Sequence, residues 1–156
     1  MVDVNRYSPQ GIIALGSVLP AGAGDYEGGA VKMMLLNDTT TIDTEWDDPA
    51  KVEIDDFTTK GEYAGSGYAR QTLANVTLTQ VGTRVYLDFD DVVISTLGAT
   101  GTLEHALIYV EKTGAAAYPA FTDRIQLCLL SLSSQPDGTD YTIAPPVGGI
   151  SLWETA

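Results

Sequence analysis

The side chains that most often perform catalysis are scarce in this chain of 156 residues, which contains one histidine, His105, and one cysteine, Cys128. A Ser-His-Asp or Cys-His site needs an imidazole as its base, so His105 is the only candidate for that role. It lies in an apolar run typical of a strand, with no nucleophile elbow near it. Cys128 also lies in an apolar run, where a small buried residue is expected. We therefore expect both residues to be structural and the chain not to be an enzyme.

Carboxylates are abundant, because the chain has 21 Asp and Glu residues. Asp88, Asp90 and Asp91, with Asp123 or Glu111, could supply oxygen ligands for Ca²⁺, but there is no EF-hand loop. A glycosidase needs two acids at a set separation in a cleft, which a sequence cannot show. Structural zinc needs about four Cys or His ligands, more than the chain contains. Acids on the outward face of a strand usually limit edge pairing, so we expect no metal and no cofactor.

The charge balance bears on the class of partner. The eight Lys and Arg residues are scattered singly, and the formal net charge is −13. Nucleic acids and anionic membranes attract clustered cations, so neither is an expected partner. There is no apolar stretch of about 20 residues for a membrane span. The apolar run at 11–16 follows only Arg6, with Asp3 nearby, so a secretory signal is not expected either.

Residues 1–30 differ in composition from the rest, with six glycines and two prolines. We interpret them as an extended arm that becomes ordered against a partner. A first strand at residues 12–18, inside the domain, is the alternative interpretation.

From residue 31 onward the pattern predicts short strands. The apolar run 31–36 is typical of a central strand with both faces covered. Residues 39–59 are polar and acidic and predict a surface connection, with one short helical turn after Asp47-Asp48, where Pro49 suits an early helical position. Residues 84–90 alternate clearly, and predict a hairpin with residues 76–79 across a turn near Gly82-Thr83. Residues 92–95 are expected to continue this strand after a bulge at Asp90-Asp91. Further strands are expected at 103–112, 125–132, 141–143 and 150–153.

Residues 103–112 also fit a helical stripe, but the flanking glycines and the central Ile-Tyr-Val favour a strand. Seven or eight strands predict an all-β, two-sheet β-sandwich of jelly-roll or immunoglobulin-like type. We assign residues 31–156 to this domain and residues 1–30 to the N-terminal arm. Gly65-Ser66-Gly67 does not open a helix, so it does not indicate a phosphate site.

Aromatic residues give the other indication of function, since the chain has eight tyrosines and two tryptophans. Trp46, Tyr63 and Tyr68 lie in loop-like sequence and could form a patch for sugar stacking or subunit contact. Packing of loops onto the sheets explains them equally well. The candidate interaction residues are completed by three in the arm, namely Tyr7, Ile12 and Ile13.

Five segments of the chain, taken together, resemble those of a known protein family, although no single one of them would identify it. They are residues 31–37, the acidic stretch through Trp46-Asp47-Asp48, residues 62–73 with the pattern Gly65-x-Gly-Tyr-x-x-x-x-Leu73, residues 85–92 and residues 106–114. The chain resembles small virion proteins encoded by tailed bacteriophages. The resemblance implies a β-sandwich subunit of the particle, without catalytic residues.

The resemblance also implies a place in the virion. The first expectation is a capsid cement or decoration subunit on the outer surface, often a trimer, whose partners are the major capsid protein and copies of itself. The alternative is a tail, neck or fibre-associated subunit, or a carbohydrate-binding module for host attachment.

Overall fold

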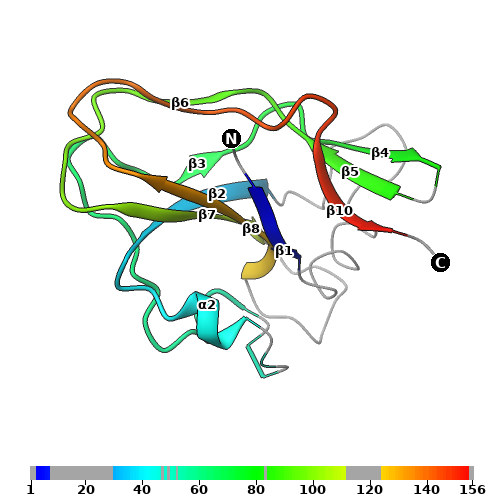
Figure 1. Cartoon of the computed structure of the whole chain (residues 1–156), viewed down its shortest axis with the longest axis horizontal. Coiled ribbons are helices and arrows are strands. Elements are labelled where there is room, and N and C mark those ends of the chain that lie inside the picture. The colour runs from blue at the N-terminus through cyan, green and yellow to red at the C-terminus, as the bar shows by residue number, and fades with distance from the viewer. Residues whose placement is uncertain are drawn as a thin grey trace.

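The computed structural model describes residues 3–7, 30–46, 48, 50–51, 53–82, 84–111 and 124–154. The elements in chain order are β1 (Asp3–Tyr7), β2 (Ala30–Asn37), α2 (Ile42–Glu45), β3 (Gln71–Thr72), β4 (Thr77–Val81), β5 (Arg84–Asp88), β6 (Val92–Ile94), β7 (Leu103–Glu111), β8 (Arg124–Ser134), β9 (Tyr141–Ile143) and β10 (Ile150–Glu154). The strands form three antiparallel sheets of five, three and two strands. The described part of the chain is therefore all-β, as the sequence predicts (Figure 1).

The five-stranded sheet has the order β1-β8-β7-β2-β3, so β7 lies at its centre between β8 and β2. In its register, Leu35 of β2 pairs with Ala106 of β7, and Ala106 also pairs with Leu130 of β8. The long apolar strands β7 and β8 are the ones that the sequence predicts at 103–112 and 125–132. The strand interpretation of 103–112 is confirmed, because β-branched and aromatic residues suit a strand that is paired on both sides.

One face of this sheet packs against the two smaller sheets. Alternate side chains, such as Leu35 of β2 and Ile108 of β7, form one apolar cluster with Leu87 of β5 and Ile94 of β6. Both leucines and Ile108 are fully buried. In Figure 1, β6 and its partner β9 lie on this side of the sheet, and the hairpin of β4 and β5 extends beyond one end of it. The packing is consistent with a β-sandwich.

The opposite face is covered by the connection that follows β2. Leu36 and Leu107 point to this side and form a second cluster with Ile42 of α2, Trp46 and Phe57. Figure 1 shows α2 below the sheet, on the side away from β6. The predicted central strand with both faces covered is thus confirmed, because neighbouring residues of a strand point to opposite faces.

The predicted hairpin is also confirmed. Val81 pairs with Arg84, so the strands β4 and β5 are joined by the two residues Gly82 and Thr83. Gly82 has a φ of +63°, which a two-residue hairpin turn favours and which glycine adopts without strain. Val85 and Leu87 are buried while Arg84 and Asp88 are exposed, as the alternation predicts.

Three expectations need correction or fall outside the described residues. The helix is α2, at Ile42–Glu45, and therefore precedes Asp47-Asp48; Asp48 and Lys51 are joined by a single turn, in which the Lys51 amide donates to the Asp48 carbonyl at 2.9 Å. Strand β6 does not continue β5 within one sheet but pairs with β9. In the predicted arm, residues 3–7 form β1, whereas the alternative strand at 12–18 lies outside the described residues.

No helix among the described residues is long and apolar enough to cross a membrane.

Candidate functional site

The aromatic residues predicted to form a surface patch belong mainly to the core. Trp46 exposes 6% of its surface, and its ring stacks on Phe57 with centroids 6.4 Å apart. Tyr63 exposes 1%. For these two rings the burial agrees with the alternative interpretation, in which loops pack onto the sheets. Large rings cover more apolar surface than any other side chain, so a loop that contains one tends to pack with the ring inward.

Tyr63 holds a neighbouring loop to the sheet. Its hydroxyl donates to the Gly98 carbonyl at 2.7 Å and accepts from the Thr100 amide at 2.9 Å. The ring also meets Tyr68 edge to face, with centroids 6.1 Å apart. These contacts satisfy backbone groups that a loop would otherwise leave unpaired. Tyr63 is therefore a structural residue at this position.

The glycine motif 65–67 has the same structural role. A Cβ at Gly65 would lie 2.4 Å from the Gly98 carbonyl oxygen and 2.4 Å from the Tyr63 ring. The Gly98 amide donates to the Ser66 carbonyl at 2.8 Å. The two backbones can approach this closely only because residues 65 and 98 have no side chain. Close packing, rather than a phosphate, accounts for these glycines.

A partly buried ion pair lies beside this loop, where Arg70 binds Glu62. The guanidinium donates from Nε to Oε1 at 2.8 Å and from Nη2 to Oε2 at 2.7 Å, the two-bond geometry that best stabilises such pairs. The Tyr68 hydroxyl donates to Glu62 Oε1 at 3.0 Å and accepts from the Leu35 amide at 3.1 Å. The hydrogen bonds from Arg70 hold the pKa of Glu62 below its usual range, and burial raises the pKa of Tyr68. Arg70 also lies 5.9 Å from the centroid of the Tyr109 ring.

This cluster has little capacity left for an outside ligand. Both carboxylate oxygens of Glu62 accept bonds from within the chain, and the face of the guanidinium is directed at an aromatic ring. Its effect is to attach the segment before β3 to the centre of the sheet. Perturbed titratable groups also occur in structural ion pairs, and this geometry is of that kind.

The residues considered for catalysis lie apart or are inaccessible. His105 is in β7, exposes 6% of its surface and pairs with Leu36. Cys128 is buried in β8, and burial raises the pKa of its thiol, so the reactive thiolate is disfavoured. Among the described residues, no three His, Cys, Asp or Glu side chains are grouped so that they could hold a metal ion.

Of the acids considered as calcium ligands, Asp88, Asp90 and Glu111 contact other groups of the chain, and Asp91 is exposed. Asp90 accepts from the Asn75 amide group at 2.7 Å, and Glu111 forms ion pairs with Lys32 and Arg124. Asp123 lies outside the described residues. Asp88 accepts from the Phe89 amide at 3.0 Å. These contacts stabilise strand ends locally.

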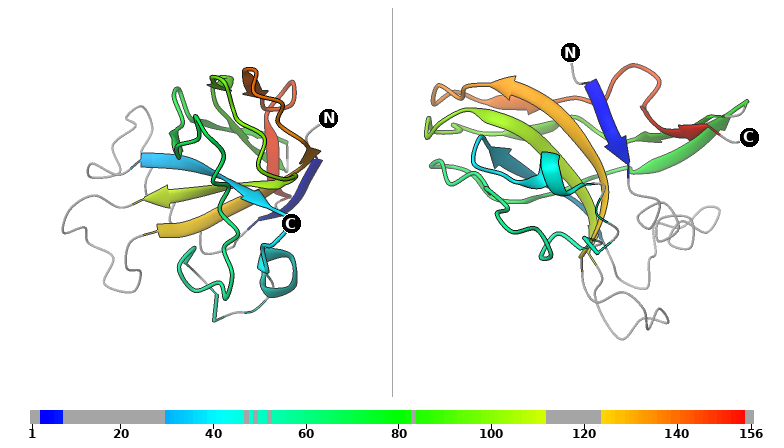
Figure 2. Two further views of the ribbon diagram at one scale, coloured as in Figure 1. Left: turned by 90° about the vertical axis from the view of Figure 1, so that its left-hand side faces the viewer. Right: turned by 60° about the horizontal axis from the view of Figure 1, so that its bottom comes forward.

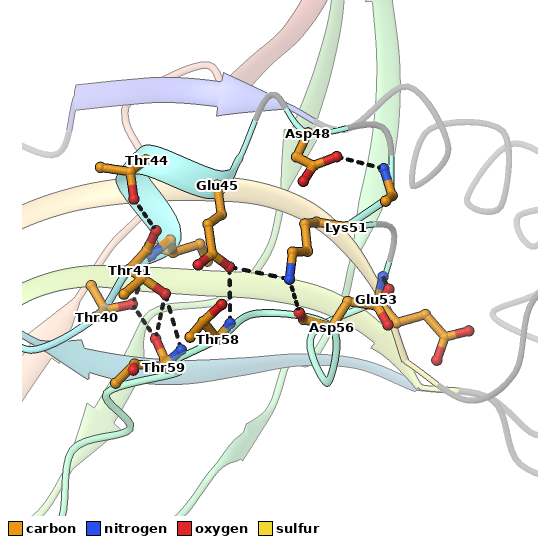
Figure 3. A network of polar contacts seen from close by, with 12 residues as sticks. Thr40, Thr41, Thr44, Glu45, Asp48, Lys51, Glu53, Asp56, Thr58 and Thr59 are labelled. Carbon is orange, nitrogen blue, oxygen red and sulfur yellow. Dashed lines mark hydrogen bonds and ion pairs between the residues drawn. The ribbon is translucent and has the colours of Figure 1, made fainter.

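A polar network holds the segment that covers the second face of the large sheet (Figure 3). Thr41 and Thr59 are joined by three hydrogen bonds. The Thr59 carbonyl accepts from the Thr41 amide at 2.9 Å and from the Thr41 hydroxyl at 3.2 Å, and the Thr59 amide donates to the Thr41 hydroxyl at 3.0 Å. Glu45 Oε2 accepts from the Thr58 amide at 2.9 Å and lies 3.5 Å from Lys51 Nζ. The bonds from Thr58 lower the pKa of Glu45 to about 2.

The covering segment is attached to β8 by two buried residues. The amide of Ile54, which has no exposed surface, donates to the Arg124 carbonyl at 3.1 Å. Gln126 of β8 exposes 3% of its surface, and its Nε2 donates to the Lys51 carbonyl at 2.6 Å. The Lys51 ammonium in turn donates to the Asp56 carbonyl. The acidic connection, which the sequence predicts to be a surface segment, therefore packs on the second face of the large sheet and is held there by hydrogen bonds. The threonines near its two ends, which make several of these bonds, are the sequence feature that could have indicated this.

The remaining candidate interaction residues belong to the predicted arm. Tyr7 lies in β1, opposite Cys128 of β8, at the edge of the five-stranded sheet. Ile12 and Ile13 lie outside the described residues. The structure thus brings Tyr63 and Tyr68 together, and places Trp46 in the cluster on the other face of the sheet.

Comparisons with protein-family models, with curated proteins and with solved structures found no match for this chain.

Proposed function

We propose that this chain is a structural subunit of a tailed-phage virion, and that it serves as a cement or decoration protein on the outer surface of the capsid. The observation that supports the proposal is that the chain buries both faces of its large sheet without a partner. Leu35 and Leu36, neighbours on β2 that point to opposite faces, are both fully buried within one chain. A subunit that closes its core on both faces can meet its partners only through its outer surface.

The family resemblance adds to this argument. The segments that carry it include β2, β5 and β7, and β2 and β7 are two of the three inner strands of the large sheet. A resemblance in central strands implies a shared fold. We propose that this fold is a two-sheet sandwich of jelly-roll or immunoglobulin-like type, with residues 1–30 as an arm.

The charge of the chain fits the outside of a capsid better than its inside. A net charge of −13 repels packaged DNA, and it keeps free subunits apart before assembly. The proposed partners are the major capsid protein and further copies of this chain, in a trimer. A stable contact of this kind buries about 1,200 Å² or more. Such added area would stabilise a thin shell against internal pressure.

The number of copies in purified particles tests the proposal. Quantitative mass spectrometry of virions of the encoding phage should find hundreds of copies for each particle. A handful of copies would contradict a cement role and favour the tail, neck or fibre alternative. Absence from purified virions would reject both roles.

The arm can be tested on empty shells from the same phage. A chain that begins at residue 8 loses β1, and a chain that begins at residue 30 also loses the segment between β1 and β2. We expect both to fold, as judged by circular dichroism, and to lose binding to shells that the full chain retains. Failure of either chain to fold would show that the deleted part belongs to the core.

A carbohydrate-binding role receives less support. The rings of Trp46 and Tyr63, which would have stacked on a sugar, are buried. A glycan array probed with the full chain, with and without a chelator, would have to show specific binding to revive this role.

A further inference from the structure

Strand β4 lies at an open edge of the three-stranded sheet. The order of that sheet is β10-β5-β4, so among the described strands β4 has β5 on one side and no neighbour on the other. Four of its five residues are exposed, and Val81 at its end exposes 62% of its surface. The hairpin of β4 and β5 extends away from the large sheet at one end of the molecule (Figures 1 and 2). The edge is therefore accessible to another chain.

The other edge strands of the described sheets carry charge in or directly before the strand. These charges are Asp3 and Arg6 in β1, Arg70 before β3, Asp91 before β6, Asp140 before β9 and Glu154 in β10. A charge at an edge opposes pairing with a second sheet, which is how natural proteins prevent association through edges. Strand β4 has neither charge nor proline, and the sequence contains no charged residue from 71 to 83. It is the one described edge without this protection.

We propose that β4 is an interaction site for a second copy of this chain, and that the two β4 strands pair antiparallel about a two-fold axis at Thr79. The exposed edge of an antiparallel strand presents backbone N–H and C=O groups that such a partner satisfies. The pairing would join two three-stranded sheets into one of six strands. This is strand addition, in which the backbone supplies affinity and the side chains supply register.

The side chains of β4 are complementary to those of an identical strand. In the proposed register, Thr79 faces Thr79 of the second copy, and Thr77 faces Val81. Threonine pairs and pairs of β-branched residues are favourable when they lie directly opposite each other. Thr77, Thr79 and Val81 are all exposed on the same face in the single chain, so the contact would cover them.

The charges nearest to this edge lie one strand back, in β5. Within each hairpin, Val81 pairs with Arg84 and Thr77 pairs with Asp88. In an antiparallel pair, both β4 strands therefore lie between Arg84 of one copy and Asp88 of the other, a separation of about 14 Å. No like charges face each other across the two β4 strands, which matters in a chain whose copies repel each other overall.

The inference does not rest on the proposed virion role, since it concerns the purified chain in solution. A pair of five-residue strands buries less than the ~1,200 Å² of a stable complex. We therefore expect reversible dimers, with a dissociation constant of roughly 0.1 mM. The dimer would form to a greater extent where many copies of the chain are held close together than in dilute solution.

Sedimentation equilibrium of the full chain at ~0.15 M salt tests the inference. We expect a monomer–dimer equilibrium, and Thr79→Lys should raise the dissociation constant at least about tenfold because it sets two cations opposite each other. The matched control is Thr142→Lys, at an exposed position of β9 in another sheet, which should leave the equilibrium unchanged. A chain that is monomeric at roughly 1 mM, or equal effects of the two lysines, would overturn the inference.

Cross-linking tests the register even if Thr79→Lys impairs folding. Thr79→Cys places one accessible thiol at the proposed axis, whereas the native Cys128 is buried. Mild oxidation should give a covalent dimer, and Val93→Cys, which replaces another exposed strand residue, should not. Equal dimer yields from the two variants, or none from Thr79→Cys, would reject pairing at β4.

Discussion

The two faces of the five-stranded sheet are buried by different means. One face meets the strands of the two smaller sheets, through residues such as Leu87 and Ile94. The other meets a connection of little regular structure, whose apolar residues are Ile42, Trp46, Ile54 and Phe57. Both covers exclude water from the middle of β2, because Leu35 on one side and Leu36 on the other have no exposed surface.

The difference lies in what holds each cover in place. Strands are held by ladders of backbone hydrogen bonds to their neighbours. The connection is held by single polar contacts, such as Glu45 with the Thr58 amide and Gln126 with the Lys51 carbonyl. The connection should therefore detach from the sheet by local unfolding more easily than the strands do, since fewer hydrogen bonds must break. Four predictions test this contrast, in order of decreasing effect.

Truncation of the two neighbouring leucines gives the largest expected effect. Leu35→Ala should lower the free energy of unfolding by about 4 kcal/mol, because the surrounding strands cannot close the cavity. Leu36→Ala should cost about 2.5 kcal/mol, since the connection can settle into the space. Urea denaturation measures both. Equal losses would show that the connection is as rigid as the strands.

Removal of the Tyr63 hydroxyl should have the next effect. Tyr63→Phe leaves the Gly98 carbonyl and the Thr100 amide without their present partner, which should cost about 1–2 kcal/mol. The control is Tyr86→Phe, a half-buried position on β5, where we expect a change below about 0.5 kcal/mol. A Tyr63→Phe variant as stable as the wild type would show that this hydroxyl does not anchor the loop.

Acid should loosen the connection before it unfolds the strands. The hydrogen bonds from Thr58 lower the pKa of Glu45 from 4.5 to about 2. Its contribution is therefore complete above pH ~4.5 and is lost as pH falls toward 2. In a Trp153→Phe background, Trp46 fluorescence should report this loss over that interval.

The matched variant for the acid experiment is Glu45→Gln, which cannot ionise. Its Trp46 fluorescence should vary less between pH 4.5 and 2 than that of the parent. If both proteins respond alike, Glu45 does not control the cover, and the carboxylates Glu62 and Asp55, whose pKa values are also lowered, become the candidates.

The smallest effect is expected from the ion pair of Lys60 and Asp55, which lies at the surface. Lys60→Gln should change the free energy of unfolding by less than about 0.5 kcal/mol, because solvent screens exposed pairs. A loss of more than about 1 kcal/mol in the free energy of unfolding, measured by urea denaturation, would mean that this pair helps to hold the connection on the sheet.

Much of the local structure could be predicted from the residues. The alternation at Val85 and Leu87 and the turn at Gly82 define a hairpin without knowledge of the rest of the fold. The loop aromatics could not be placed in this way. A tryptophan in polar sequence can lie in an exposed patch or be buried in the core. Trp46 is buried because its ring stacks on Phe57 and packs against the apolar face of the sheet.

The position of the short helix illustrates the same limit. Asp47-Asp48 followed by Pro49 has the composition of a helix start, yet α2 ends before it. Four residues are too few to be stable through propensity alone, so tertiary contacts select the site. Ile42 faces the sheet from α2, and its burial outweighs the preference of the following residues.

Alternation with a period of two is a local property of the backbone, so it identifies the strands and their inward-facing side chains without reference to the rest of the fold. Which strand lies beside which, and hence which edges stay open, is visible only in the folded chain. Pairing order depends on contacts between residues far apart in the chain. For that reason the charge-free stretch around Thr79 acquires a possible role only once β4 is seen to end a sheet.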